Sequence, residues 1–257
     1  MLFNLLQMFR FPLGFDTGSA APDVSAKPLN SGLLEDVAIV SSQLGTVEVF
    51  VGGISCNVSD KPAHTLAFHP EAQFEGMRSI SVPITKETAV RVTGTLAAAG
   101  SFGASLGFQP IPDETLARWG GQVPDVKAIG KDIELYFGLG SVVVPLGGTA
   151  TLRGKALSAC RLGALVLDGS IAAAAYDISI SSIKVRNKPM QAAELDTVGA
   201  VAGEFLGAFT YLATDLDGRV LGQDMEQGHE VEIVLVNRNA ADITVYGTIF
   251  LLPTDGG

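Results

Sequence analysis

Three stretches of this chain place polar residues at spacings close to those of known ligand sites. The run Gly148–Ala156, GTATLRGKA, resembles a phosphate-binding loop. However, five residues separate its glycines where the motif has four, and Ala156 stands where a hydroxyl must meet magnesium. We therefore interpret this run as a turn between strands.

A second stretch resembles a calcium-binding loop. Asp215, Asp217 and Glu226 occupy the first, third and twelfth positions of such a loop. The sharp turn at the sixth position requires glycine, yet Val220 stands there, and Arg219 places a cation where a ligand belongs. A helix–loop–helix calcium site is excluded. A looser calcium site at these acids and a solvated acidic loop both stay open.

Histidines and nucleophiles give no stronger signal. His64, His69 and Glu71 lie close together, but a spacing of five between the histidines fits no single helix face and zinc needs further ligands. His229 stands alone beside acidic residues and is expected at the surface. The chain contains no G-x-S-x-G nucleophile motif.

Paired carboxylates leave one catalytic class open. Asp132 and Glu134 fall on an expected strand. A glycosidase that uses two carboxylates on a β-sandwich is not excluded, because the sequence hides the separation of those groups in space. Aromatic side chains that would stack on a sugar are few, and Trp119 is the single tryptophan. We expect no enzymatic activity, no cofactor and no metal site.

Composition limits the class of protein. Of 257 residues, 47% are hydrophobic and only 17% are charged, yet no run of about 20 apolar residues is long enough to span a bilayer. Apolar surface buried between subunits would explain this balance, and so would a β protein with many small apolar side chains. The net charge of -10 argues against sequence-specific nucleic-acid binding, although a local basic face is not excluded.

Two smaller signals concern modification. Cys56 and Cys160 lie in different halves and have no metal-like spacing, so two buried thiols are favoured over a disulfide. Asn57-Val58-Ser59 is a formal glycosylation sequon. It carries little weight because the apolar start, Met1–Phe15, has no basic residue before its apolar run and is not a convincing signal peptide.

The elements that would position these residues are nearly all strands. A strand–turn–strand unit occurs twice, at Thr88–Pro110 and at Val231–Pro253, and the two copies align without a gap at an offset of 143 residues. Each copy is expected to be a hairpin, as is the pair Val37–Ser42 and Thr46–Val51. Ile178–Val185 needs a small bulge if its isoleucines are to share one face.

This pattern predicts an all-β protein made of two tandem β-sandwich or jelly-roll domains with few short helices. A short helix is expected at Asp113–Trp119, and Ala192–Phe209 is the one longer helical candidate, expected as a helix in a long connection between strands although its glycines weaken it. The predicted organisation is an extended N-terminal arm and linker over residues 1–32, a first jelly-roll-like domain over 33–121, a connection over 122–131 and a second jelly roll over 132–257.

The second half also resembles a known family. The run Ile180–Pro189, ISSIKVRNKP, precedes a long connection, and Gly228–Asn239, GHEVEIVLVNRN, leads into the last strand. This order is similar to that of tandem jelly-roll major capsid proteins of icosahedral bacteriophages, many of which enclose a membrane. The resemblance covers Asp132–Pro253 and, more weakly, Leu33–Pro112. A single jelly roll with a smaller β domain is the alternative.

The resemblance implies a structural virion protein that forms homotrimers, tiles an icosahedral shell with other virion proteins and assembles in the host cytoplasm. It also implies that the N-terminal arm contacts a neighbouring subunit or an internal lipid membrane. The alternative for the arm is a strand or coil folded onto its own domain. The expected interface residues are Leu2, Phe3, Leu5, Leu6, Phe9, Arg10 and Phe11.

Two other functions remain open. A trimeric phage spike or attachment module would bind a receptor without tiling. A secreted carbohydrate-binding or carbohydrate-active β-sandwich would carry an aromatic-lined groove.

Overall fold

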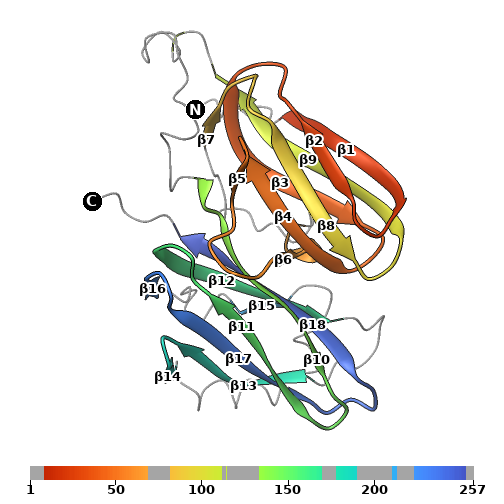
Figure 1. Ribbon diagram of the computed structural model, residues 1–257, viewed down its shortest axis with the longest axis vertical. Coiled ribbons are helices and arrows are strands. Elements are labelled where there is room, and N and C mark those ends of the chain that lie inside the picture. Colours follow the sequence, from red (N-terminus) through yellow and green to blue (C-terminus); the bar gives the residue numbers. More distant parts are fainter. Residues whose placement is uncertain are drawn as a thin grey trace, which may run out of the picture. The chain divides into compact units, whose positions relative to one another are not determined.

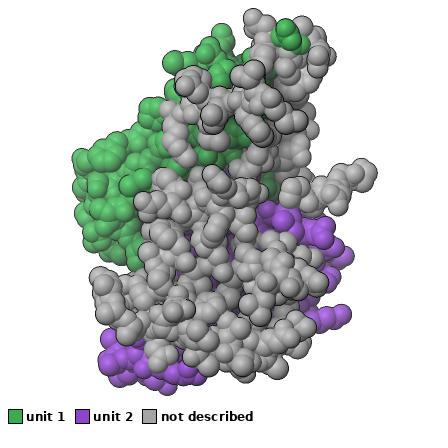
Figure 2. All heavy atoms as spheres, turned by 180° about the vertical axis from the view of Figure 1, so that it is seen from behind, with its two compact units in different colours: residues 1–56, 68–134 green, residues 57–67, 135–257 purple. Residues whose placement is uncertain are grey.

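The chain folds into two compact units, which Figure 2 shows in separate colours. Unit 1 comprises Met1–Cys56 and Phe68–Glu134, and unit 2 comprises Asn57–Ala67 and Leu135–Gly257. The computed structural model describes residues 9–68, 82–111, 114, 133–169, 178–189, 210–212 and 223–252.

Unit 1 is built from two antiparallel sheets (Figure 1). The first has the order β1-β9-β3-β7 and the second the order β2-β8-β4-β5. The strands are β1 (Phe9–Ser19), β2 (Asp23–Ala26), β3 (Gly32–Ser41), β4 (Gly45–Val51), β5 (Ile54–Ser55), β7 (Val82–Ile84), β8 (Val90–Leu96) and β9 (Gly100–Pro110).

Unit 2 repeats this plan. Its first sheet has the order β10-β18-β12-β15, with β16 added beside β12, and its second the order β11-β17-β13-β14. The strands are β10 (Tyr136–Val144), β11 (Thr149–Lys155), β12 (Cys160–Gly169), β13 (Ile178–Val185), β14 (Lys188–Pro189), β15 (Thr210–Leu212), β16 (Asp224–Met225), β17 (Glu230–Asn237) and β18 (Ile243–Leu252). The remaining strand, β6 (Ala63–His64), comes from the segment Asn57–Ala67.

The two units share one strand order. With β6 and β16 set aside, the first, eighth, third and sixth strands of each unit form one sheet, and the second, seventh, fourth and fifth form the other. This interleaving of two Greek keys defines the jelly roll. The predicted all-β fold with jelly-roll domains is confirmed, and unit 1 contains a full set of eight strands.

The predicted hairpins are wrong, although the strands themselves are present. β3 and β4 are consecutive but belong to different sheets, and the same holds for β8 and β9 and for β17 and β18. β9 pairs with β1 and β3, whereas β8 pairs with β2 and β4. The short turn therefore carries the chain from one sheet to the other, and backbone hydrogen bonds go to strands far away in sequence.

The predicted arm and linker over residues 1–32 differ from the structure. Phe9–Ser19 forms β1, which pairs along its length with β9, and Asp23–Ala26 forms β2. Register shifts between Pro12 and Gly14 and between Thr17 and Ser19 interrupt the alternation of β1, which hides the strand from a period-of-two reading. The alternative of a strand folded onto its own domain holds for Phe9–Ser19.

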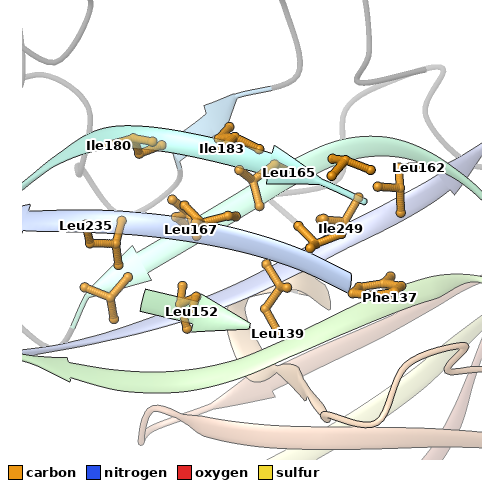
Figure 3. Close-up of a cluster of buried hydrophobic side chains, with 14 of the residues drawn as sticks. Phe137, Leu139, Leu152, Leu162, Leu165, Leu167, Ile180, Ile183, Leu235 and Ile249 are labelled. Atoms are coloured by element: carbon orange, nitrogen blue, oxygen red, sulfur yellow. The ribbon is translucent and has the colours of Figure 1, made fainter. Parts of the chain in front are cut away.

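The core of unit 2 lies between its two sheets. Figure 3 shows buried side chains from both sheets converging, among them Phe137, Leu139, Leu152, Leu165 and Leu235. Each such side chain contributes about 1.5–3 kcal/mol through burial. In β13 the register shifts between Ile180 and Ser182, so the predicted bulge is confirmed.

A buried amide closes the turn between β17 and β18. The Nδ2 group of Asn237 donates to the carbonyls of Val144 (3.0 Å) and Ala241 (2.8 Å), and its Oδ1 accepts the backbone N–H of Asn239 (2.8 Å). Asn237 is fully buried, so these bonds replace the water that its amide loses. They explain why the chain turns at Asn237–Asn239, the polar end of the run GHEVEIVLVNRN.

Helix is scarce among the described residues, where the 3-10 turn η1 (Thr65–Phe68) is the one named helical element. The predicted helix Ala192–Phe209 lies outside the described residues, and so does Asp113–Trp119 apart from Glu114. Within the described part, no helix has the length and apolar character needed to cross a bilayer.

Candidate assembly surfaces

The stretch that resembles a phosphate loop is a turn followed by a strand. Gly148 donates its N–H to the carbonyl of Pro145 (2.9 Å), and β11 then pairs with β17 along its whole length. The interpretation as a turn between strands is confirmed. Asp215 and Asp217 lie outside the described residues, so the loose calcium site stays a prediction.

The two histidines that the structure describes, His64 and His229, differ in burial. His64 is buried, and burial lowers its pKa to about 4, an effect that the backbone of Val166 offsets in part. His69 and Glu71 lie outside the described residues. His229 is half-buried, with its Nδ1 accepting the backbone N–H of Glu226 (2.9 Å). Where the structure describes the chain, no three His, Cys, Asp or Glu residues come together as a metal site.

Both cysteines are buried free thiols. Burial raises the pKa of Cys56 to about 12, so its thiol stays protonated and unreactive at neutral pH. This agrees with the prediction of two buried thiols.

The sequon residues Asn57 and Ser59 form a structural clip in unit 2. The Oδ1 atom of Asn57 accepts the backbone N–H groups of Gly138 and Ser59, both at 3.1 Å. Its Nδ2 group donates to the carbonyl of Lys61 (2.6 Å). Ser59 Oγ contacts the carbonyl of Gly138 (2.6 Å). The amide nitrogen that a glycan would modify is therefore a hydrogen-bond donor to the backbone of Lys61 in this fold.

Asn57–Ala67, here called the strap, crosses the outer face of the sheet β10-β18-β12-β15. Pro62 accepts the backbone N–H of Gly140 (3.0 Å), and the N–H of His64 donates to Oγ1 of Thr248 (3.1 Å). β6 contacts both β10 and β18. In sequence the strap lies between β5 and β7 of unit 1, so the predicted division at residues 122–131 misses this exchange.

The outer face of the corresponding sheet in unit 1 carries an exposed apolar row. In the register of β1, β9 and β3, Phe15 lies opposite Gly103, and Gly103 lies opposite Val40. Opposite residues share one face of a sheet. The side chain of Phe15 is 69% exposed and that of Val40 is 54% exposed. We call Phe15, Gly103 and Val40 the apolar row.

The equivalent row of unit 2 is polar. Gly103 corresponds to Tyr246 in the 143-residue repeat, and Tyr246 lies opposite Ser141, whose side chain is exposed. A jelly roll thus accommodates polar groups at this position. The strand order does not require an aromatic and an aliphatic side chain in unit 1, so the apolar row is a candidate contact surface.

The predicted interface residues fall in two groups. Leu2, Phe3, Leu5 and Leu6 lie outside the described residues, so their role stays a prediction. Phe9, Arg10 and Phe11 are part of β1, opposite Phe108, Gly107 and Leu106. Phe15 and Val40 carry no signal in the sequence, because their exposure depends on which strands become neighbours.

Comparison with known proteins yields no family. No family model matches this chain, and neither does any curated protein. Among solved structures, the major capsid protein P2 from bacteriophage PM2 is similar at 13% identity and a TM-score of 0.40, covering 97% of this chain and 100% of that one. A peptide-N(4)-(N-acetyl-β-D-glucosaminyl) asparagine amidase is similar at 11% identity and a TM-score of 0.32, covering 97% of each chain. With TM-scores this low, neither likeness assigns an activity to this chain.

Proposed function

We propose that this chain is a structural subunit of a virus particle, a major capsid protein that builds a shell by self-association. The observation that carries this proposal is the presence of two jelly rolls of identical strand order in one chain. Jelly rolls form the building blocks of many viral capsids, but the same fold also serves lectins and cupins, so this step is a fold-level analogy.

The apolar row supports self-association. Phe15 and Val40 expose apolar surface on the outer face of their sheet, and a partner that covered them would remove that surface from water. Of the functions considered, a shell protein makes the most use of such a contact because every subunit buries lateral faces. The proposed role is structural rather than catalytic.

The proposed assembly unit is a homotrimer. A head-to-tail contact between copies closes into a ring when the rotation allows it. Three copies of a chain with two equivalent rolls would present six similar rolls around one axis, which suits tiling. The proposed location is the virion, and the residues before β1 remain the proposed contact with other virion components or with an internal lipid membrane.

The decisive experiment measures the native mass of the purified protein by light scattering, with negative-stain imaging of the same fraction. We expect a trimer that converts to particles tens of nanometres across, the order of size of a closed shell of many such subunits. A trimer that never tiles would favour an attachment module. A species with the mass of a single chain at every concentration would refute the proposal.

A further inference from the structure

The outer face of the sheet β11-β17-β13-β14 in unit 2 concentrates positive charge at one end. In one cross-strand row, Glu232 lies between Arg153 and Lys184, with nitrogen–oxygen distances of 3.2 and 3.9 Å. Lys155 lies opposite Glu230 in the next row. The cations of this end, here called the basic face, are Arg153, Lys155 and Lys184 on the outer face, Arg186 in the turn after β13, and Lys188 on the exposed edge strand β14, where it lies opposite the core residue Val185.

The basic face ends at the tight turn between β13 and β14, where the charged side chains are exposed to solvent. Arg186 and Asn187 have positive φ values of 54° and 59°, the conformation of a two-residue type I′ turn between β13 and β14. Arg186 and Lys188 are exposed. Among the described residues, five cations share this end of the sheet with Glu230, Glu232 and Asp60, whose Oδ1 accepts the backbone N–H of Lys155 (2.7 Å). Cations therefore exceed anions there, in a chain whose net charge is -10.

The equivalent sheet of unit 1 provides an internal comparison. There Arg91 forms a two-pronged ion pair with Asp23, and Lys27 pairs with Glu87 at 3.2 Å. Each of these cations has a carboxylate of its own. The same fold position in the same chain is therefore neutralised in unit 1 and cation-rich in unit 2, so the strand order alone does not call for the excess.

Two features indicate which kind of partner the basic face would bind. Glu230 and Glu232 stand among the cations, and they would repel a phosphate backbone or a lipid headgroup layer, whereas a mixed face suits a protein surface. The chain as a whole is strongly acidic, so copies of it repel one another unless one region carries the opposite sign.

We infer that the basic face is the surface on which the acidic surface of a second copy of this chain docks, which makes assembly salt-dependent. This inference rests on the proposed function and names one contact through which it operates. Because attraction between exposed charges is screened at high ionic strength, the contact weakens as salt is added.

The test uses the full chain with two charge-reversed residues. Lys155→Glu/Lys188→Glu changes two exposed side chains that have no ion pair among the described residues and do not occupy the positive-φ turn. The control, Lys27→Glu/Lys86→Glu, changes the net charge equally on unit 1 and, among the described residues, gives up only the exposed Lys27–Glu87 ion pair, which contributes little to stability. Circular dichroism and thermal unfolding first establish that both variants fold like the native chain.

Light scattering then gives the concentration of half-assembly at about 20 mM and about 500 mM NaCl. We expect the native chain and the control to assemble more readily at low salt, and Lys155→Glu/Lys188→Glu to need at least about tenfold higher concentration. Native assembly that is indifferent to salt and to this variant would overturn the inference and leave the capsid proposal standing. A native chain that stays monomeric under all these conditions would refute both the inference and the capsid proposal.

A final arm tests polyanions. Native protein and both variants are mixed with duplex DNA and with vesicles containing an anionic lipid. If Lys155→Glu/Lys188→Glu assembles like the control but loses binding to either probe, the basic face serves a polyanion and the inference is wrong.

Discussion

The side-chain oxygen of Asn57 accepts a hydrogen bond from the backbone N–H of Gly138, 81 positions later in the chain, at 3.1 Å. This bond joins the start of the strap to β10. Around it, Ser59 bonds to both residues, so a short polar sequence is tied to the sheet at several atoms. The strap is therefore an integral part of unit 2.

Asn57→Ala should destabilise the folded chain by about 2–3 kcal/mol, because it leaves the backbone N–H of Gly138 without its acceptor and removes one of the two side-chain donors to the carbonyl of Lys61, the other being Ser59 Oγ. Asn57→Asp keeps the acceptor and loses the donor, so its cost should be intermediate. Chemical denaturation gives the free energy of unfolding. Asn30→Ala, at an exposed position, is the control and should change it little. If Asn57→Ala and Asn30→Ala lower the free energy of unfolding equally, the hydrogen bonds of Asn57 do not stabilise the strap.

Gly138→Ala should destabilise unit 2 by about 2–4 kcal/mol, since a methyl group there would collide with the backbone of Lys61 and Pro62. The matched control is Gly103→Ala. Its methyl would meet Cδ2 of Phe15 at 3.0 Å, and that exposed ring can move aside. Thermal unfolding of the two variants gives the comparison, and a Gly138→Ala variant as stable as Gly103→Ala would show that the strap does not lie against β10.

Lowering the pH should reduce the free energy of unfolding, because His64 is buried in its neutral form. Its folded pKa of about 4 lies below the ordinary value of 6.5, so between these values the unfolded state binds more protons than the folded state. The stabilisation is complete above pH 6.5 and is lost as the pH falls toward 4, to an extent of at most about 3 kcal/mol. His64→Asn, which retains an acceptor for the N–H of Ala67, should remove this part of the pH dependence.

His229→Asn is the control for this titration. Nδ1 of His229 also accepts a backbone N–H three residues away, so His229→Asn makes the same chemical change at a half-buried position. The free energy of unfolding at pH 7.5 and pH 4.5 is compared for the native chain and both variants. Parallel pH profiles for the native chain and His64→Asn would disprove the role of His64.

Replacing the apolar row should weaken self-association without harming the fold. Phe15→Ser/Val40→Thr removes the exposed apolar side chains on either side of Gly103. We expect the concentration of half-assembly, measured by light scattering, to rise at least about tenfold. Leu29→Ser, at an exposed residue between β2 and β3, is the control. Unchanged assembly in the double variant would exclude this row from the interface.

Much of the fold was predictable because strands leave local signals. The period of two in the sequence of β17 predicts that Val231, Ile233 and Leu235 share one face, and all three are buried. The crowded isoleucines of β13 indicated its bulge. The 143-residue repeat survives as two jelly rolls, with β9 and β18 beginning at the matched residues Gly100 and Ile243.

By itself, the sequence determined that the protein is all-β, where most strands run and that the strand–turn–strand unit occurs twice. Only the tertiary structure decided which strands become neighbours, because backbone hydrogen bonds join any two strands regardless of side-chain identity. That choice placed β8 and β9 in different sheets and set Phe15 and Val40 on either side of Gly103. It also brought Asn57 to Gly138, a contact between distant residues that no local pattern encodes.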